Sequence, residues 1–175
     1  RGREKLLREA MHSVLNQTWP RIELLVVEDG GDSQRDLVEQ TAALYPAQSV
    51  RFMPQPKVGR CKTGNAGLAA ATGDYLMFLD DDDLLFCDHI EVCLTALIET
   101  PELGAAYCLA WEVQTDFDVE PPAVYEEKSH GTPVELRQHF DRSVMRHHNF
   151  IAIQAAVFRR ELYDRYGGFD TELEN

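Results

Sequence analysis

Positive charge is scarce in this chain of 175 residues. It has 17 lysines and arginines against 30 aspartates and glutamates, which gives a net charge of −13. Such an excess of negative charge repels nucleic acid and anionic membrane surfaces, so neither is an expected partner. A nucleotide can still bind an acidic protein when a metal ion bridges its phosphates to carboxylates.

Long apolar runs are also absent, and none reaches the roughly 18 residues that a membrane-spanning helix needs. The cysteines include no C-x-x-C pair, so their spacing gives no sign of a zinc site. We therefore expect buried thiols and, because a reducing compartment keeps thiols free, a cytoplasmic location. The four cysteines are Cys61, Cys87, Cys93 and Cys108.

Five apolar residues, 75–79, lead directly into four aspartates, 80–83. A short continuous apolar run predicts a strand buried on both faces, as in a parallel sheet. The aspartates then follow the carboxyl end of the strand, where open α/β sheets bind ligands. Four adjacent carboxylates repel one another, and Mn²⁺ or Mg²⁺, which prefer oxygen ligands, would relieve that repulsion. The alternative is a solvated acidic turn.

Helical and strand patterns alternate along the chain, which predicts an α/β fold: a mostly parallel sheet with helices on both faces. Residues 1–175 are expected to form a single domain. Asp88 with Glu91 resembles a capping box at one helix start, and residues 114–131 read as a loop or an edge hairpin. The predicted helices cover residues 3–16, about 33–45, 61–71, 88–99, a short segment opening at 132–133, and 159–166; the predicted strands cover 24–27, 50–53, 75–79, 105–113 and 151–158.

A second acidic pair, Glu28-Asp29, ends the predicted strand at 24–27. In a parallel sheet this pair and the aspartate run face the same edge, with the loop at Gly59 between them. We expect Asp29 to accept a hydrogen bond from a nucleotide base, Asp82 to hold the metal, and Asp80 or Asp81 to bind a ribose hydroxyl. The alternative for Asp29 is a turn residue that caps the next helix.

Several stretches together resemble family-two glycosyltransferases of the GT-A fold, a Rossmann-like fold of nucleotide-diphospho-sugar transferases. The resemblance covers nearly the whole chain, and its D-x-D segment is the aspartate run. The matching stretches are residues 13–20, 22–30, 69–75 with 78–83, 158–163 and 167–170.

The resemblance implies transfer of a hexosyl or N-acetylhexosaminyl group from a nucleotide-sugar, usually a UDP-sugar, with inversion and with Mn²⁺ or Mg²⁺. The acceptor would be a saccharide or a lipid-linked sugar, as in the synthesis of cell-envelope polysaccharides. By this similarity the donor-binding residues are Glu28, Asp29, Gly59, Lys62, Asn65, Asp80 and Asp81, the metal ligands are Asp80 and Asp82, and the acceptor side holds His148, Asn149 and Gln154.

The sequence departs from the family pattern in the middle loop and at its ends. Many members carry an arginine where this chain has Gly64, so Arg60 or Lys62 would have to supply that positive charge. The family's first strand would precede Arg1, and its catalytic acidic pair, which includes the base, would follow Asn175. Within the chain, Glu174 is then the one near candidate for the catalytic base.

Two alternatives remain open from the sequence. A phosphotransferase of the haloacid-dehalogenase type also places D-x-D after an apolar strand, but on its first strand and with Thr or Val where this chain has Leu84. A domain that binds nucleotide-sugar or metal without turnover would carry the same donor residues.

Overall fold

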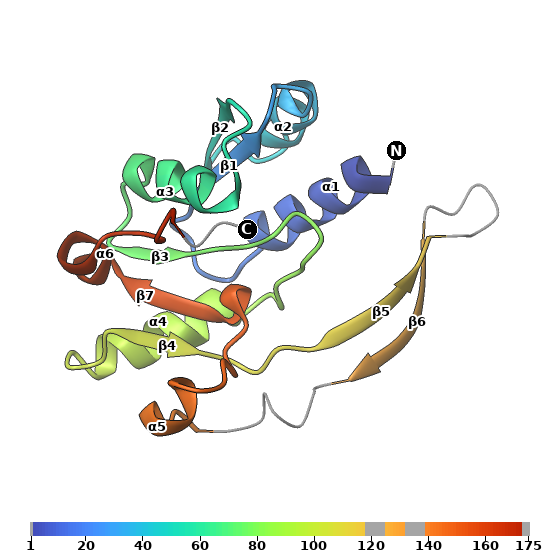
Figure 1. Ribbon diagram of the computed structural model, residues 1–175. Coiled ribbons are helices and arrows are strands. Elements are labelled where there is room, and N and C mark those ends of the chain that lie inside the picture. The colour runs from blue at the N-terminus through green and yellow to red at the C-terminus, as the bar shows by residue number, and fades with distance from the viewer. Residues whose placement is uncertain (1, 118–124, 132–138, 173–175) are drawn as a thin grey trace.

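The computed structural model describes residues 2–117, 125–131 and 139–172, and Figure 1 shows their arrangement. The helices are α1 (Gly2–Leu15), α2 (Arg35–Ala42), α3 (Arg60–Ala70), α4 (His89–Glu99), α5 (Arg142–Met145) and α6 (Arg160–Tyr166). The strands are β1 (Glu23–Asp29), β2 (Ser49–Gln55), β3 (Tyr75–Met77), β4 (Ala105–Tyr107), β5 (Glu112–Asp116), β6 (Glu126–Gly131) and β7 (Ala156–Arg159), with a 3-10 turn η2 (Ile153–Ala155) before β7.

Strands β1 and β2 pair in parallel, from Glu23 opposite Ser49 to Asp29 opposite Gln55. Helices α1 and α2 cover one face of this pair through a buried cluster formed by Leu7, Met11, Leu15 and Val38, against which Leu24 and Val26 pack. Helix α3 contacts β1 from the other side, where Gly67 approaches Val27. Burial on both faces explains why the sequence of β1 is continuously apolar rather than alternating.

Strand β7 lies between β3 and β4 and runs antiparallel to both. The α/β class is confirmed, whereas the pairing in this sheet is mixed. An apolar pattern predicts that a segment is a strand but carries no information about its direction, so the sequence did not reveal the reversal. Helix α4 covers this sheet, with Leu97 and Val157 at 0% and 3% exposure in the shared core.

Of the loop or edge hairpin expected over residues 114–131, the hairpin is correct, since β5 and β6 pair antiparallel. They form a two-stranded sheet of their own, which projects from the rest of the fold (Figure 1). The hairpin contacts α1 at Tyr125, whose hydroxyl donates a hydrogen bond of 2.6 Å to the Glu9 carboxylate. That bond is the main reason why the pKa of Tyr125 rises to about 12. The short helix expected to open at 132–133 lies outside the described residues.

The predicted capping box at α4 is wrong. The Asp88 side chain makes no capping bond, because Gln17 takes that place: its Oε1 accepts from the amide of Ile90 at 3.0 Å. Glu91 instead accepts a hydrogen bond from the Thr18 hydroxyl. A partner distant in the sequence therefore satisfies the helix end and ties it to the segment after α1.

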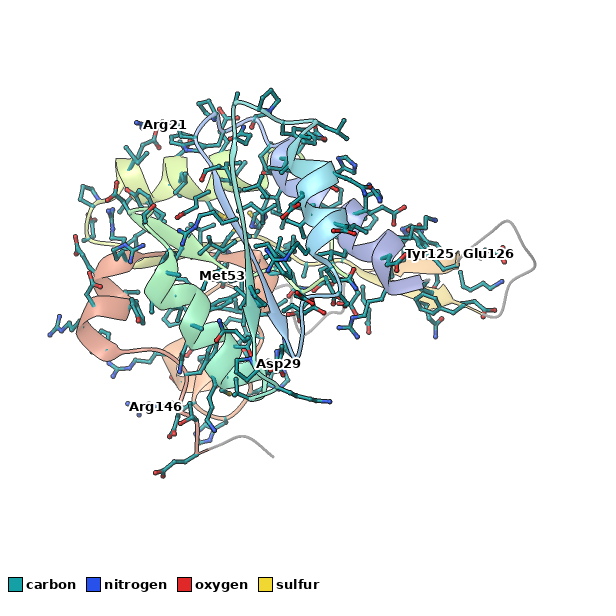
Figure 2. All side chains as sticks on the ribbon, turned by 90° about the horizontal axis from the view of Figure 1, so that it is seen from above. Arg21, Asp29, Met53, Tyr125, Glu126 and Arg146 are labelled. Atoms are coloured by element: carbon teal, nitrogen blue, oxygen red, sulfur yellow. The ribbon has the colours of Figure 1, made fainter. Side chains whose placement is uncertain are left out.

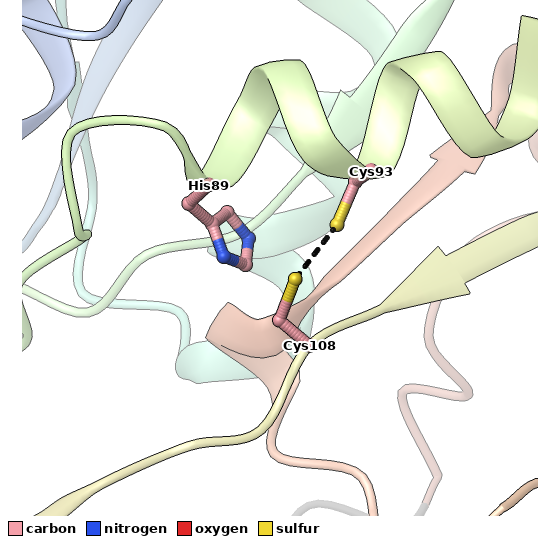
Figure 3. A group of neighbouring side chains, drawn as sticks. All are labelled: His89, Cys93 and Cys108. Carbon is pink, nitrogen blue, oxygen red and sulfur yellow. Dashed lines mark hydrogen bonds between the residues drawn. The ribbon is translucent and has the colours of Figure 1, made fainter.

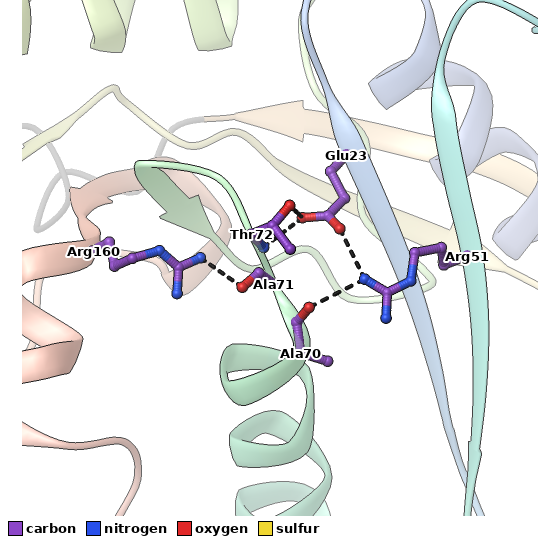
Figure 4. Close-up of polar contacts among 6 residues, drawn as sticks. All are labelled: Glu23, Arg51, Ala70, Ala71, Thr72 and Arg160. Atoms are coloured by element: carbon purple, nitrogen blue, oxygen red, sulfur yellow. Dashed lines mark hydrogen bonds and ion pairs between the residues drawn. The ribbon is translucent and has the colours of Figure 1, made fainter.

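A polar network joins the two parallel strands to the start of β3 (Figure 4). The Glu23 carboxylate accepts from the Thr72 amide at 2.7 Å and from Arg51 at 2.9 Å. Arg51 also reaches the carbonyl of Ala70, and Arg160 reaches that of Ala71. Burial raises the pKa of Glu23, but the hydrogen bonds from Thr72 and Arg51 outweigh it and leave that pKa below its ordinary value. The carboxyl end of α3 is thus fixed between the two sheets.

Among the residues that the structure describes, no helix combines the length and the apolar character needed to cross a bilayer.

Candidate functional site

The aspartate run leaves the sheet as a turn. Strand β3 ends at Met77, and the amide of Asp83 donates to the carbonyl of Asp80 at 3.2 Å. This turn gathers Asp80, Asp82 and Asp83, whose nearest carboxylate oxygens all lie within 4.8 Å of one another. We call these three residues the carboxylate cluster. Asp81 points elsewhere and accepts two hydrogen bonds, of 2.6 and 2.9 Å, from Arg3 at the start of α1.

The carboxylate cluster is electrostatically unfavourable on its own. Partial burial raises the pKa of Asp83 above its ordinary value, and the charges of Asp82 and Asp80 raise it further. Arg60 offsets part of the repulsion, since its guanidinium lies 2.5 Å from Asp80. Within the described part of the chain, Asp82 and Asp83 form no ion pair with a basic side chain.

A hard divalent cation fits this donor set. Carboxylate oxygens are the ligands that Mn²⁺ and Mg²⁺ prefer, and a cation between them would remove the repulsion that raises the Asp83 pKa. The metal ligands expected from the sequence were Asp80 and Asp82, which do lie together. Asp83, which the sequence did not single out as a ligand, lies with them because the turn brings its carboxylate back to the other two; metal binding by any of the three stays a prediction.

Asp29 lies at the end of β1 (Figure 2), and its carboxylate holds the loop before α3. It accepts from the amides of Val58 at 2.8 Å and Gly59 at 3.2 Å, and these bonds hold the pKa of Asp29 below its ordinary value. Gly59 has a φ of 94°, a conformation that favours glycine. The next residue, Arg60, reaches the carboxylate cluster, so this loop connects the two acidic strand ends.

A shallow pocket of about 510 Å³ lies at the carboxyl ends of β1 and β2, beside Asp29. Its wall includes Gly30 and Gly31, both at positive φ, where the backbone carries no side chain. The lining consists of residues 30–32 and 54–57.

Three other predicted donor residues lie on or near this edge. Glu28 bonds to its own neighbourhood, accepting from the hydroxyl of Ser33 at 2.5 Å and from the amide of Gln34 at 3.0 Å at the start of α2. Lys62 and Asn65 lie on α3. Contact of these residues with a donor stays a prediction.

The amide of Asn65 holds the segment after α6. Its Nδ2 donates to the carbonyl of Phe169 at 2.9 Å, and its Oδ1 accepts from the Phe169 amide at 2.7 Å. The Phe169 ring packs on Phe78, with centroids 5.0 Å apart. Gly64 makes this possible, because a Cβ there would lie 2.8 Å from the Phe169 ring. The departure from the family pattern at Gly64 therefore has a packing reason.

The predicted acceptor-side residues precede β7. His148 and Asn149 are exposed after α5, and Gln154 is half-buried in η2. Because β7 starts where β3 and β4 end, with Met77 opposite Val157, Gln154 lies at the same sheet edge as the carboxylate cluster.

The predicted location of the catalytic base is not tested by the structure. Glu174, the candidate inside the chain, and Asn175, after which the acidic pair of the family is expected, both lie outside the described residues. The last described residues are Thr171 and Glu172, where the amide of Glu172 donates to the Asp170 carboxylate at 2.9 Å. Asp170 therefore serves as a turn residue here, and a base at Glu174 or beyond Asn175 stays a prediction.

Two solved structures have a similar fold. The mannosyltransferase PcManGT from Pyrobaculum calidifontis, in complex with GDP-Man and Mn²⁺, matches with a TM-score of 0.67 at 22% identity over 96% of this chain and 44% of its own. S. aureus TarS 1-349 in complex with UDP gives a TM-score of 0.67 at 17% identity, over 99% of this chain and 49% of its own. These likenesses confirm the GT-A fold.

Sequence comparison identifies the family. YwdF of Bacillus subtilis (strain 168), an uncharacterized glycosyltransferase, is 30% identical over 172 residues, which are 95% of this chain and 58% of YwdF. YibD of Escherichia coli (strain K12), also an uncharacterized glycosyltransferase, is 33% identical over 104 residues, or 59% of this chain and 29% of YibD. The chain thus spans only part of the relatives it matches. The sequence model of glycosyl transferase family 2 matches residues 1–167, which excludes the haloacid-dehalogenase alternative. The chain belongs to glycosyl transferase family 2.

Proposed function

We propose that this protein transfers a hexosyl or N-acetylhexosaminyl group from a UDP-sugar to a hydroxyl of a saccharide or lipid-linked acceptor, with inversion at the anomeric carbon. The proposal rests on one observation in this family-two chain. Arg60, which directly follows the loop held by Asp29, contacts Asp80 of the carboxylate cluster, so this loop joins the two acidic strand ends. Residues 1–175 would act as a single nucleotide-sugar-binding domain in cell-envelope polysaccharide synthesis in the cytoplasm.

The donor would lie along the carboxyl ends of β1 and β3. The shallow pocket beside Asp29 would receive the uracil and ribose, with Glu28 and Gly59 beside it, and the diphosphate would extend towards Asp81 and the carboxylate cluster. Two solved neighbours support this class of donor, since one was determined with GDP-Man and Mn²⁺ and the other with UDP.

The carboxylate cluster would hold Mn²⁺ or Mg²⁺. Bound there, the ion supplies electrostatic stabilisation of the negative charge that develops on the leaving nucleoside diphosphate. Among the described residues, Arg60 is the basic residue best placed to add to that stabilisation, since it already contacts Asp80. Lys62 lies in the same first turns of α3. His148, Asn149 and Gln154 would orient the acceptor on the opposite side of the cluster.

Calorimetric titration of UDP tests the donor site. We expect tight binding with Mn²⁺ and binding at least tenfold weaker in EDTA, because the acidic edge repels a bare diphosphate. Asp82→Asn should abolish the effect of Mn²⁺ on UDP affinity. The matched control is Asp74→Asn, directly before the start of β3, and it should leave that effect unchanged. Equal UDP affinity with and without metal would refute the proposed site.

Turnover is tested by acceptor-dependent release of UDP from a set of UDP-sugars. Release that requires both acceptor and Mn²⁺ and disappears in Asp82→Asn supports the transferase. Metal-dependent UDP binding without any acceptor-dependent release would instead favour the non-catalytic nucleotide-sugar-binding domain.

A further inference from the structure

A second group of metal-ligating side chains lies away from the carboxylate cluster, between α4 and β4 (Figure 3). His89 and Cys93 are four residues apart on α4 and therefore share one face of the helix. Cys108 follows β4 directly and approaches the same face, with its sulfur 3.5 Å from that of Cys93. One ligand atom from each of the three residues lies within 4.8 Å of the others.

Two of these side chains, those of His89 and Cys93, are buried in the protein core, and that of Cys108 is half-buried. Cys93 is 1% exposed and His89 is 8% exposed, and apolar residues such as Leu94 and Met77 pack around them. The Nε2 atom of His89 is buried without a hydrogen-bond partner. A buried polar atom without a partner costs free energy. A ligand bound at Nε2 of His89 would remove that cost.

We propose that His89, Cys93 and Cys108 bind a thiophilic metal ion, Zn²⁺ in the first instance. Two thiolates and an imidazole are soft to intermediate ligands, which favour Zn²⁺ over the oxygen-seeking Mn²⁺ and Mg²⁺. Two thiolates on a tetrahedral zinc, with Zn–S bonds of about 2.3 Å, stand about 3.8 Å apart. The two sulfurs are already within a few tenths of an ångström of that spacing.

Three protein ligands leave the fourth position of a tetrahedral ion to a water molecule or another small ligand. Cys108 is only half-buried, whereas Cys93 and His89 are buried, so the group is most open to solvent on the side of Cys108. The site is distinct in composition from the carboxylate cluster, which contains no sulfur or nitrogen donor.

The ion would fasten the loop that leads from the carboxylate cluster into α4. Only residues 84–88 lie between Asp83 and His89, and the same loop is already held by hydrogen bonds from the Thr18 amide to Cys87 and from the Gln17 side chain to Phe86. A bound ion adds a link from the start of α4 to the end of β4. Its role is therefore structural support of the donor site rather than catalysis.

Cobalt substitution tests the site in the reduced, metal-free protein, because thiolate ligands give Co²⁺ an intense near-ultraviolet charge-transfer absorption and carboxylates do not. We expect this band to saturate at one Co²⁺ per chain and to vanish when Zn²⁺ is added. Cys93→Ser, Cys108→Ser and His89→Ala should each weaken Co²⁺ binding at least tenfold. The matched controls Cys61→Ser and Cys87→Ser should retain the band.

The unmodified protein decides the question even if a variant fails to fold. Absence of the charge-transfer band in the folded wild-type protein would overturn the proposal, as would equal loss of the band in the Cys61→Ser control. Thermal stabilisation by Zn²⁺ should persist in Asp82→Asn; if that change removed it, the ion would be bound by the carboxylate cluster and the proposal would fail. Failure here leaves the UDP titration with Mn²⁺ unaffected, since the two sites share no ligand.

Discussion

Replacing Asp83 by asparagine should stabilise the metal-free protein at neutral pH. Its carboxylate is partly buried beside two others, and its pKa is raised by that burial and by the charges of Asp82 and Asp80. At pH 7 the folded state therefore carries an unfavourable charge that the unfolded chain does not feel. Asparagine is nearly the same size and removes that charge, so the packing of the turn should be kept.

The size of the effect follows from the spacing of the carboxylate cluster. The carboxylate oxygens lie within 4.8 Å of one another, and at that upper limit two unit charges repel by about 0.9 kcal/mol in a medium as polar as water and by about 3.5 kcal/mol at an effective dielectric constant of 20. The lower end applies, because solvent reaches the cluster and Arg60 neutralises part of the charge on Asp80. We expect Asp83→Asn to raise the free energy of unfolding by about 1 kcal/mol.

The pH dependence of stability tests independently whether Asp83→Asn stabilises the protein. Because the pKa of Asp83 is higher in the folded than in the unfolded chain, the stability it contributes is present below the unfolded pKa, about 3.9, and is lost as pH rises through the folded value. The advantage of Asp83→Asn over wild type should therefore be full at pH 7, shrink as the pH falls through the raised folded pKa of Asp83, and be gone below about pH 3.9. Urea unfolding in EDTA at several pH values measures it, with Asp74→Asn as the control.

Mn²⁺ should reverse the order of stabilities. An ion that binds only the folded state adds about 2.7 kcal/mol at a hundred times its dissociation constant, and Asp83→Asn removes one of its three ligands. Wild type should then be the more stable protein in saturating Mn²⁺. If Asp83→Asn were less stable than wild type in EDTA at pH 7, the Asp83 carboxylate would be a stabilising group and the reasoning about repulsion would be wrong.

Three further changes test other contacts of the site. Asp29→Asn should destabilise the protein at neutral pH, with the difference lost on acidification because the folded pKa of Asp29 is lowered, and should blur the choice between UDP and CDP in calorimetry. Gly168→Ala should cost about 1–3 kcal/mol in urea unfolding, because its Cβ would lie 2.0 Å from Asn65 Oδ1; Gly131→Ala, which meets nothing within 4 Å, is the control. Arg60→Gln should strengthen Mn²⁺ binding in the absence of donor, since the ion pair competes for a carboxylate ligand, and weaken UDP binding several-fold; a fall in both affinities would contradict this.

The sequence predicted the elements of the fold well only where burial alone decides them. The strands expected over 105–113 and 151–158 are wrong in extent, since β4 covers only Ala105–Tyr107 and β7 only Ala156–Arg159. The apolar run at 24–27 gave β1 because the strand is covered on both faces. The run at 75–79 gave β3 only as far as Met77; Phe78 leaves the strand and stacks near Phe158 and Phe169. An apolar residue predicts burial equally well in a strand and in a loop, so the sequence could not show where β3 ends.

Contacts between distant segments were not predictable from local patterns. The cap of α4 comes from Gln17 rather than from the expected Asp88. Cys93 and Cys108 lack the close spacing of a familiar zinc motif and meet only because β4 packs against α4. Such partners are set by tertiary packing, for which spacing in one sequence holds no signal.

Gly64 and Arg60 together explain how this chain departs from its family and still keeps a positive charge at the site. They are four residues apart on α3 and so lie on one face of the helix, with Arg60 one turn nearer the strand ends. A long side chain at the later position would collide with the Phe169 ring, which needs the absence of a Cβ there. Arg60 meets no such obstacle, and its backbone follows directly on the loop that Asp29 holds. Asp29, which holds this loop, therefore also sets the position of the Arg60 guanidinium beside Asp80. In the proposed function, nucleoside recognition and metal binding would then share this loop although they lie at different strand ends.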